Sequence, residues 1–372
     1  MGEQQPVLHL GVFGVFNAQE RMTLAQQVHS CLEAGFRWQI SHTLDADALF
    51  LAGGSCHLHG PAANNQLQLS IDLGQDKTHQ LALAHWHTPT LIGLPAQEQV
   101  QALPAPFLPV DGWQQRSQGL HDTLRSVTQA MRYERVLYAL GAGMLRERDL
   151  VFSELGQKNA HVLHIYDLHH LAAVLIPEKQ QILFSTEADS VRSHAWGWCR
   201  RPAAAAESKP PHFLKVSFEE ALWSYAMRTP YLQSPETFVQ EGLAFARRPD
   251  VRPSMLRQRH AVLFQRLNSN SDAIFQKLQN PAHRVQLPEV LQRDLYALHL
   301  CGCLLAHVPQ NLMHGVVGKI RDWTHGLVLQ RQAKKRPALP ARQLASTFSL
   351  SLMPPVRNSR QGPSQLQVSG WF

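Results

Sequence analysis

The alternation of short apolar runs with amphipathic segments over residues 7–131 constrains the fold more than any other feature of this sequence. The run Val7–Phe16 is apolar, β-branched and aromatic, and a segment with helical spacing of apolar residues follows it and ends at Gly35. Four further runs of strand length are Phe36–Ile40, Ala48–Leu51, Leu91–Leu94 and Phe107–Val110. A closing helix is indicated by the spacing of Leu120, Leu124, Val127 and Met131. Short apolar strands that alternate with amphipathic helices predict a parallel sheet covered on both faces.

This succession of strands and helices resembles the receiver domain of bacterial response regulators, which has the flavodoxin-like fold. The resemblance covers the first third of the chain. Asp47–Gly53 is similar to the approach to a receiver's third strand, Thr88–Pro95 to its fourth strand, and Phe107–Val110 to the place where a receiver carries its lysine. An ordinary α/β domain without receiver ancestry is the alternative. In both cases the expected fold class is α/β, and the resemblance specifies a flavodoxin-like or receiver-like parallel sheet.

The residues that a receiver uses for its chemistry are missing from the matching positions. The resemblance implies an acidic pair after the first strand to hold Mg²⁺, an aspartate ending the third strand to accept phosphate, and a lysine ending the fifth. The chain has Phe13–Asn17 at the first of these places, Leu51–Gly54 at the second and Pro109-Val110 at the third. Without clustered carboxylates there is no oxygen-rich site for Mg²⁺ and no phosphoryl acceptor. We therefore expect a pseudo-receiver, which is not phosphorylated in the usual way.

The segment from Arg132 to Asp167 imitates a dinucleotide-binding unit without completing it. Arg132–Gly143 is a strand-like run that ends in Gly-Ala-Gly, and a helical stretch separates it from the strand-like run that ends at Asp167. In a dinucleotide-binding unit the helix N-terminus holds a pyrophosphate and the acid holds a ribose. Arg146 stands where the third glycine belongs, so nucleotide binding stays open. The hairpin pattern of residues 171–184 favours a small mixed α/β domain instead.

A linker rich in proline and alanine follows at residues 202–211. Beyond it the apolar spacing predicts helices, with Ser217 and Ser254 as N-caps and the most regular helix running from Leu287 to about His307. Cys301-Gly-Cys303 falls inside that helix, where we expect two small core residues. The predicted division is a pseudo-receiver-like α/β domain at 1–131, a small mixed α/β domain at 132–201, the linker at 202–211, a helical domain at 212–330 and a basic, disordered tail at 331–372.

Charge is distributed unevenly along the chain, whose formal net charge is +7. Residues 1–112 carry nine acidic and three basic residues, whereas residues 311–372 carry nine basic residues and one acidic residue. The tail contains Lys334, Lys335 and Arg336. Such a tail favours a polyanion, which can be nucleic acid, an acidic protein surface or the chain's own acidic N-terminal domain. The helical segments contain no recognisable helix-turn-helix, so the sequence leaves DNA binding open.

Two pairs of arginines are candidate ligand-binding residues. They are Arg200 with Arg201, and Arg257 with Arg259. Guanidinium groups clamp phosphates and stack on bases, so either pair suits a cyclic dinucleotide.

Histidine is abundant, with 21 residues, and some of it is paired. His57 with His59 and His85 with His87 have the spacing that places both rings on one side of a strand. Imidazole nitrogens bind Zn²⁺, so these four residues are candidate metal ligands. The alternative is that they are solvated or core side chains.

The known sequence signatures of enzymes are largely missing. No nucleophile elbow, P-loop, kinase signature or paired-carboxylate motif occurs, so the sequence favours binding over catalysis and identifies no cofactor. The first residues, Met1–Gln5, lack the basic start and the apolar core of a signal peptide, and no apolar run approaches the roughly 18 residues of a membrane helix. We therefore expect a cytoplasmic, bacterial regulatory protein that docks to another protein or senses a ligand. The alternatives are a regulator that binds a cyclic dinucleotide or nucleic acid, and a His-liganded metal enzyme.

Overall fold

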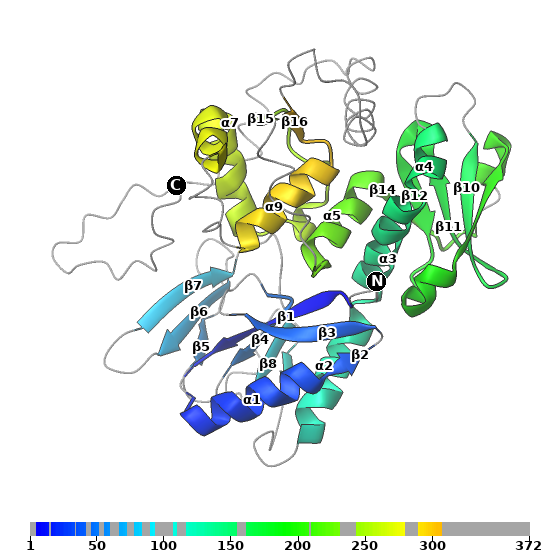
Figure 1. The fold of residues 1–372 in the computed structure, drawn as a ribbon. Helices are drawn as coiled ribbons and strands as arrows, with labels where there is room; N and C mark the ends of the chain where they lie inside the picture. Colours follow the sequence, from blue (N-terminus) through cyan, green and yellow to red (C-terminus); the bar gives the residue numbers. More distant parts are fainter. Residues whose placement is uncertain are drawn as a thin grey trace.

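The computed structural model describes residues 5–14, 16–33, 35–41, 46–51, 56–59, 67–72, 78–83, 90–93, 107–109, 117–154, 161–207, 210–230, 243–279 and 289–306. In Figure 1 a sheet near the N-terminus has two helices along one side and a group of later helices on the other side, and a second sheet lies next to that group. None of the described helices combines the length and the hydropathy that crossing a membrane requires.

The N-terminal sheet consists mainly of parallel strands, as predicted. Its parallel strands are β1 (Val7–Phe13), β3 (Phe36–Ser41), β4 (Ala48–Leu51), β8 (Thr90–Gly93) and β9 (Phe107–Pro109). They lie in the order β3-β1-β4-β8-β9, and every neighbouring pair in this series is parallel. The short strand β2 (Leu32–Glu33) extends the edge and runs antiparallel to β3. The apolar runs that predicted these strands therefore form them, because β-branched and aromatic side chains pack well on a pleated surface.

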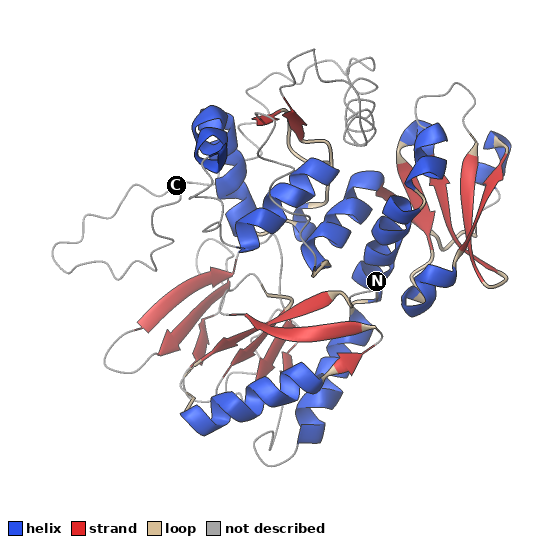
Figure 2. Cartoon of the chain, in the orientation of Figure 1, coloured by secondary structure: helices blue, strands red, loops and turns tan. Residues whose placement is uncertain are grey.

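Two helices, α1 (Ala18–Ser30) and α2 (Ser117–Ala130), cover one face of this sheet (Figure 2). Asn17 begins α1 with a capping box, in which its side chain accepts the N–H of Glu20 and the Glu20 carboxylate accepts the N–H of Asn17. The buried Trp38 indole donates to Thr128 of α2 at 3.1 Å. The core on this side contains Leu8, Leu10, Leu24, Val28, Phe36, Phe50, Ile92, Leu120, Leu124 and Val127.

The opposite face of the sheet contacts the C-terminal half of the chain. Because side chains alternate along a strand, Leu49 and Leu51 point away from α1 and α2, and both are buried. On this side Arg228 and Arg257 reach Asp47. The sheet is thus covered on both faces as predicted, but one cover comes from residues far away in the sequence and not from helices between its strands.

A three-stranded antiparallel sheet lies between β4 and β8 in the sequence. It consists of β5 (Cys56–His59), β6 (Leu67–Asp72) and β7 (Thr78–Leu83), with β6 in the centre. The sequence analysis did not predict it, although the alternation of apolar and polar residues in Leu67–Ile71 is the pattern of a strand with one buried face.

Residues 132–143, predicted as a strand-like run, belong to a helix, so the dinucleotide-binding interpretation was wrong. α3 (Arg132–Arg146) and α4 (Arg148–Glu154) follow α2 directly, and α3 packs against α5 (Phe218–Arg228). A Cβ on Gly141 would lie 2.3 Å from the carbonyl oxygen of Ala221 in α5, and one on Gly143 would lie 2.7 Å from the ring of Trp198. The two glycines permit close packing of a helix and do not form a phosphate-binding turn.

The second sheet is antiparallel throughout. Its strands are β13 (Gly197–Arg201), β10 (Val162–Asp167), β11 (His170–Ile176), β12 (Gln181–Phe184) and β14 (Leu214–Ser217), in that order across the sheet. The predicted hairpin is confirmed, with the 3-10 turn η2 (Pro177–Lys179) between β11 and β12. Two further 3-10 helices are η3 (Ser190–Ala195) and η4 (Ala203–Glu207), and η4 lies within the predicted linker.

The first helix after the second sheet begins at its predicted cap, whereas the next described helix does not. Ser217 caps α5 as predicted, since its hydroxyl accepts the N–H of Glu220. α7 (Gln258–Gln279) begins later than predicted, because the 3-10 helix η5 (Pro253–Met255) takes up the residues after Arg252. Ser254 therefore lies inside η5 and does not cap α7.

The last described helix is shorter than predicted. α9 (Glu289–Leu300) ends before Cys301, and Gly302 turns the chain with a φ of 62° into β16 (Leu304–Ala306), which pairs antiparallel with β15 (Leu243–Phe245). Cys301 and Cys303 are fully buried as expected, but they lie in this turn and not in a helix.

One hydrophobic core joins α3, the second sheet and the C-terminal helices. It includes Leu140 of α3, Leu175 of β11, Leu222 of α5, Phe264 of α7 and Leu298 of α9. Side chains from the predicted mixed domain and from the predicted helical domain thus share this core. The division between residues 132–201 and 212–330 stays a prediction.

Candidate functional site

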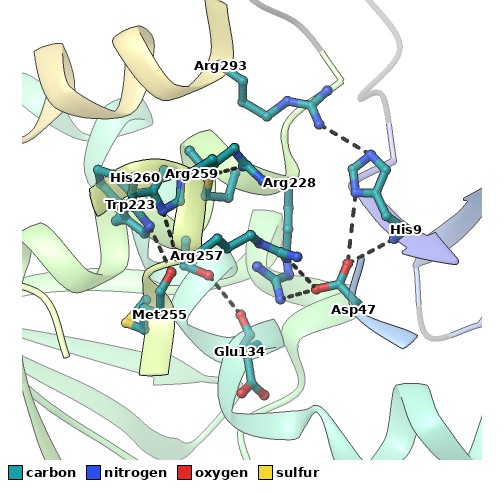
Figure 3. A network of polar contacts seen from close by, with 12 residues as sticks. His9, Asp47, Glu134, Trp223, Arg228, Met255, Arg257, Arg259, His260 and Arg293 are labelled. Atoms are coloured by element: carbon teal, nitrogen blue, oxygen red, sulfur yellow. Dashed lines mark hydrogen bonds and ion pairs between the residues drawn. The ribbon is translucent and has the colours of Figure 1, made fainter. Parts of the chain in front are cut away.

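A group of buried charged side chains lies where the N-terminal sheet meets the C-terminal helices (Figure 3). Asp47 immediately precedes β4, and its side chain is 2% exposed. Its Oδ2 accepts the backbone N–H of His9 at 2.9 Å. Its Oδ1 accepts hydrogen bonds from Arg228 at 3.0 Å and from Arg257 at 3.3 Å. We call Asp47, Arg228 and Arg257 together the Asp47 cluster.

The elements that position the Asp47 cluster come from both halves of the molecule. Asp47 is held in place by the sheet, because its backbone N–H donates to the carbonyl of His9 in β1 at 2.8 Å. Arg228 is the last residue of α5, and Arg257 immediately precedes α7. The cluster therefore connects the sheet with two helices of the C-terminal half.

A second buried network holds α7 against α9. Arg259 donates to both carboxylate oxygens of Asp294, at 2.9 and 3.1 Å, and His260 Nε2 lies 3.0 Å from the same carboxylate. Burial alone would raise the pKa of Asp294, but Arg259 and His260 outweigh it and hold that pKa at about 2. The Asp294 carboxylate is therefore ionised at neutral pH.

The protonation state of His260 follows from its two partners. Burial lowers its pKa, although Asp294 favours the charged form. The backbone N–H of Arg257 donates to His260 Nδ1 at 2.9 Å, so Nδ1 is an acceptor and the ring proton lies on Nε2, which faces Asp294. The rings of Trp223 and His260 form a T-shaped pair with 5.0 Å between their centroids. His260 thus fixes the beginning of α7, where Arg257 and Arg259 lie.

His9 and Arg293 extend the charged region along the sheet face. Arg293 Nη1 lies 3.3 Å from His9 Nε2, and Arg293 Nη2 donates to the exposed Glu289 at 2.7 Å. Burial lowers the pKa of His9 to about 4, because the opposing effect of Asp47 is smaller and Arg293 adds to the shift. His9 is therefore neutral at pH 7, and its Nε2 accepts a hydrogen bond from Arg293.

A half-open pocket of about 40 Å³ lies between these groups. Its lining residues are His9 and Ser41 from the sheet, and Met227, Arg257, Arg259, Val290 and Arg293 from the helical side. Guanidinium groups stay protonated and donate hydrogen bonds, so they bind anions and do not transfer protons at neutral pH. The arrangement is suited to binding an anion and not to acid–base catalysis.

The structure separates the two arginine pairs predicted from the sequence. Arg257 and Arg259 both line the pocket. Arg200 and Arg201 lie on the edge strand β13, where Arg200 pairs with the buried Glu154 at 3.0 Å and donates to Ser153 at 2.7 Å. The first pair is therefore part of the candidate site, and Arg200 has a structural role in joining β13 to α4.

The predicted metal ligands and the predicted polyanion-binding tail fall largely outside the described residues. The backbones of His57 and His59 lie in β5, but their side chains are not described, and His85, His87, Lys334, Lys335 and Arg336 lie in segments that the structure does not describe. Within the described ranges no group of three or more His, Cys, Asp or Glu side chains is arranged to hold a metal ion.

Sequence reasoning missed His9, Asp47, Arg228 and Arg293 as members of the site. Asp47 had a usable signal, since an acid directly before the fully buried run Ala48–Leu51 must find a partner if it is buried with the strand. Arg293 interrupts the apolar stripe of α9 in a similar way. Neither signal names the partner.

Comparisons with protein-family models, with curated proteins and with solved structures give no match for this sequence. The function is therefore interpreted from the geometry of the site.

Proposed function

We propose that this chain is a regulatory protein that acts by binding, through a receiver-like N-terminal domain that does not accept phosphate and that docks on the chain's own C-terminal helices. The order of its parallel strands supports the receiver-like part of this proposal. Numbered along the chain, the order β3-β1-β4-β8-β9 is 2-1-3-4-5, which is the order of flavodoxin-like sheets.

The described carboxyl ends of the parallel strands support the loss of phosphorylation. β1, β4, β8 and β9 end at Phe13, Leu51, Gly93 and Pro109, which carry no carboxylate or amine. Asp47 lies at the opposite, amino end of β4 and is already bound to two arginines. It is therefore not a substitute for the missing phosphoacceptor.

The observation that carries the proposal is the Asp47 cluster. A buried carboxylate of the receiver-like domain is neutralised by two arginines from the helical side, so the domain presents this face to its own chain. A receiver changes its surface on phosphorylation, whereas in this chain the corresponding domain is held by an internal partner. Release of that contact would expose the sheet face to another protein, which makes the domain a docking or self-inhibitory surface.

Hydrogen exchange measured by mass spectrometry tests the docking. Arg228→Met removes one of the two arginines on Asp47, and we expect faster amide exchange in β1, in β4 and at the beginning of α7. Arg125→Met is the matched control, because Arg125 forms its ion pair with Glu33 at the exposed surface of the N-terminal domain. Unchanged exchange in β1 and β4 of Arg228→Met would overturn the docking proposal.

Two measurements test the mode of action. On incubation of the full chain with Mg²⁺ and acetyl phosphate, we expect no covalent phosphoryl group in the intact mass, whereas an acid-labile adduct would contradict the proposal. Native mass spectrometry of the chain purified from the cells that produce it should show a bound protein or small molecule. A bare chain that turns over a substrate would point to an enzyme instead.

A further inference from the structure

We infer that the pocket between the sheet and the helices binds the terminal phosphate group of a small molecule, and that this ligand holds the receiver-like domain against the helical side. The inference deepens the proposed function and rests on the docking that it describes. The pocket lies against the sheet beside His9 in β1 and Ser41, the last residue of β3.

The geometry of the arginines favours a tetrahedral oxyanion. Arg257 and Arg259 extend from the beginning of α7, and Arg293 comes from α9, so their donors approach the same small space from two elements. A phosphate group offers several acceptor oxygens in different directions, whereas a carboxylate is planar and is satisfied by one fork of donors. The positive end of the 22-residue helix α7 adds to the attraction.

The charges of the described side chains around the pocket favour an anionic ligand. Arg228, Arg257, Arg259 and Arg293 are buried around the pocket and the Asp47 cluster, and the buried carboxylates beside them are Asp47 and Asp294. Glu289 also pairs with Arg293, but its side chain is 65% exposed. Four guanidinium groups thus lie beside the three carboxylates Asp47, Asp294 and Glu289, and a terminal phosphate, with about −1.5 to −2 charges at pH 7, would be attracted to this positive region.

Arg293 also has a donor to offer. Its side chain is 9% exposed, and its Nε is buried without a hydrogen-bond partner among the residues that the structure describes. A buried donor without a partner costs free energy, so a small movement of the side chain that brings this Nε to a bound anion would be favourable. His9 is neutral at pH 7 and therefore brings no negative charge to the pocket.

The size of the pocket limits what can enter it. A volume of about 40 Å³ admits on the order of three water molecules, which is the scale of one phosphate group and not of a base or a sugar. Because the pocket is half-open, the rest of a phosphorylated molecule can lie outside, along the apolar side chains of Met227 and Val290. A terminal phosphate fits this shape better than the doubly esterified phosphate of a cyclic dinucleotide.

Isothermal titration calorimetry on the full chain tests the inference, with inorganic phosphate as the first probe and sodium chloride at equal ionic strength as the reference. We expect saturable binding of phosphate. Arg293→Met should weaken it about tenfold or more, because it removes charge-assisted hydrogen bonds. Arg293→Lys keeps the charge and the fold, so its affinity for phosphate should lie between those of the unsubstituted chain and of Arg293→Met.

A matched pair of surface variants separates the pocket from general electrostatics. Val290→Glu places a carboxylate at the mouth of the pocket and should weaken phosphate binding, whereas Val262→Glu adds the same charge on α7 at a residue outside the pocket lining and should not. The two valines are 39% and 45% exposed, so neither substitution disturbs the core. Equal weakening by both variants would overturn the inference.

Further probes identify the source of the phosphate. Adenosine monophosphate that binds more tightly than inorganic phosphate would support a phosphorylated small molecule, whereas tight binding of a cyclic dinucleotide alone would overturn the terminal-phosphate assignment. No binding of any of these probes above the chloride reference would overturn the inference itself. The docking proposal is judged separately, because the hydrogen exchange of Arg228→Met is measured without any ligand.

Discussion

Replacement of Asp47 by asparagine is expected to destabilise the folded chain by about 3–5 kcal/mol, the usual cost of removing one member of a buried ion pair. The side chains of Asp47, Arg228 and Arg257 are only 2%, 9% and 10% exposed, so water does not replace the lost charge. Asparagine has nearly the same volume as aspartate and leaves no cavity. The expected loss is therefore due to the two guanidinium groups whose charge is no longer balanced.

The partner variant gives the size of the coupling. Arg228→Met should cost less, about 1–2 kcal/mol, because Asp47 keeps its hydrogen bonds to Arg257 and to the backbone of His9. In the double variant fewer charges are left unbalanced than in Asp47→Asn alone. Its loss should therefore be smaller than the sum of the single losses by about 1–3 kcal/mol.

Urea unfolding followed by circular dichroism measures these differences. Asp122→Asn is the control, because its side chain is 54% exposed and a surface substitution of this kind changes stability by about 0.5 kcal/mol or less. An Asp47→Asn variant as stable as the Asp122→Asn control, or strictly additive losses in the double variant, would refute the assignment of Asp47 as the charge that joins the two parts.

Three further predictions follow from packing, titration and exposure. Gly141→Ala should destabilise the chain by about 1–3 kcal/mol despite the higher helix propensity of alanine, because the new Cβ meets a backbone oxygen at 2.3 Å. Gly197→Ala is the control, since its Cβ meets no atom within 4 Å. Equal melting temperatures of the two variants would contradict this prediction. The pKa of His9 is lowered from 6.5 to about 4, so between these values the unfolded chain binds a proton that the folded chain does not. The free energy of unfolding should therefore fall by about 2 kcal/mol from pH 7 to pH 5. In urea titrations at the two pH values His9→Gln should show a smaller drop, and an unchanged drop would be evidence against this assignment. In a brief alkylation followed by peptide mapping, the partly exposed Cys199 should be labelled before Cys31, because Cys31 is 3% exposed and burial raises its pKa to about 11. Faster labelling of Cys31 would disprove this order.

The N-terminal sheet was predictable because its information is local. Ala48–Leu51 is a strand in the sequence pattern and in the structure, since an apolar run of that length bounded by polar or glycine residues has few other uses. Arg132–Gly143 was misjudged for the opposite reason. Its apolar residues and glycines suit a strand and turn locally, but the contact of Gly141 with α5 decides in favour of a close helix pair.

The candidate site was only half predictable. The short spacing of Arg257 and Arg259 could be noticed in the sequence, whereas their partners could not. Asp47 lies 181 residues before Arg228 and 210 before Arg257, and no local pattern carries information over such separations. The chemistry of a buried carboxylate says that a cation must be present, but only the tertiary fold says which one.

The C-terminal helices that cover one face of the N-terminal sheet are synthesised long after the strands of that sheet. Arg293 is synthesised 284 residues after His9, which at about 5–20 residues per second leaves an interval of roughly 15–60 s. During the first part of that interval the N-terminal sheet has left the ribosome while its Leu49, Leu51 and Asp47 still face water, because Arg228 and Arg257 follow Asp47 by 181 and 210 residues. The nascent chain therefore passes through a state in which this face is open to any chaperone or neighbouring chain that reaches it before α9 does.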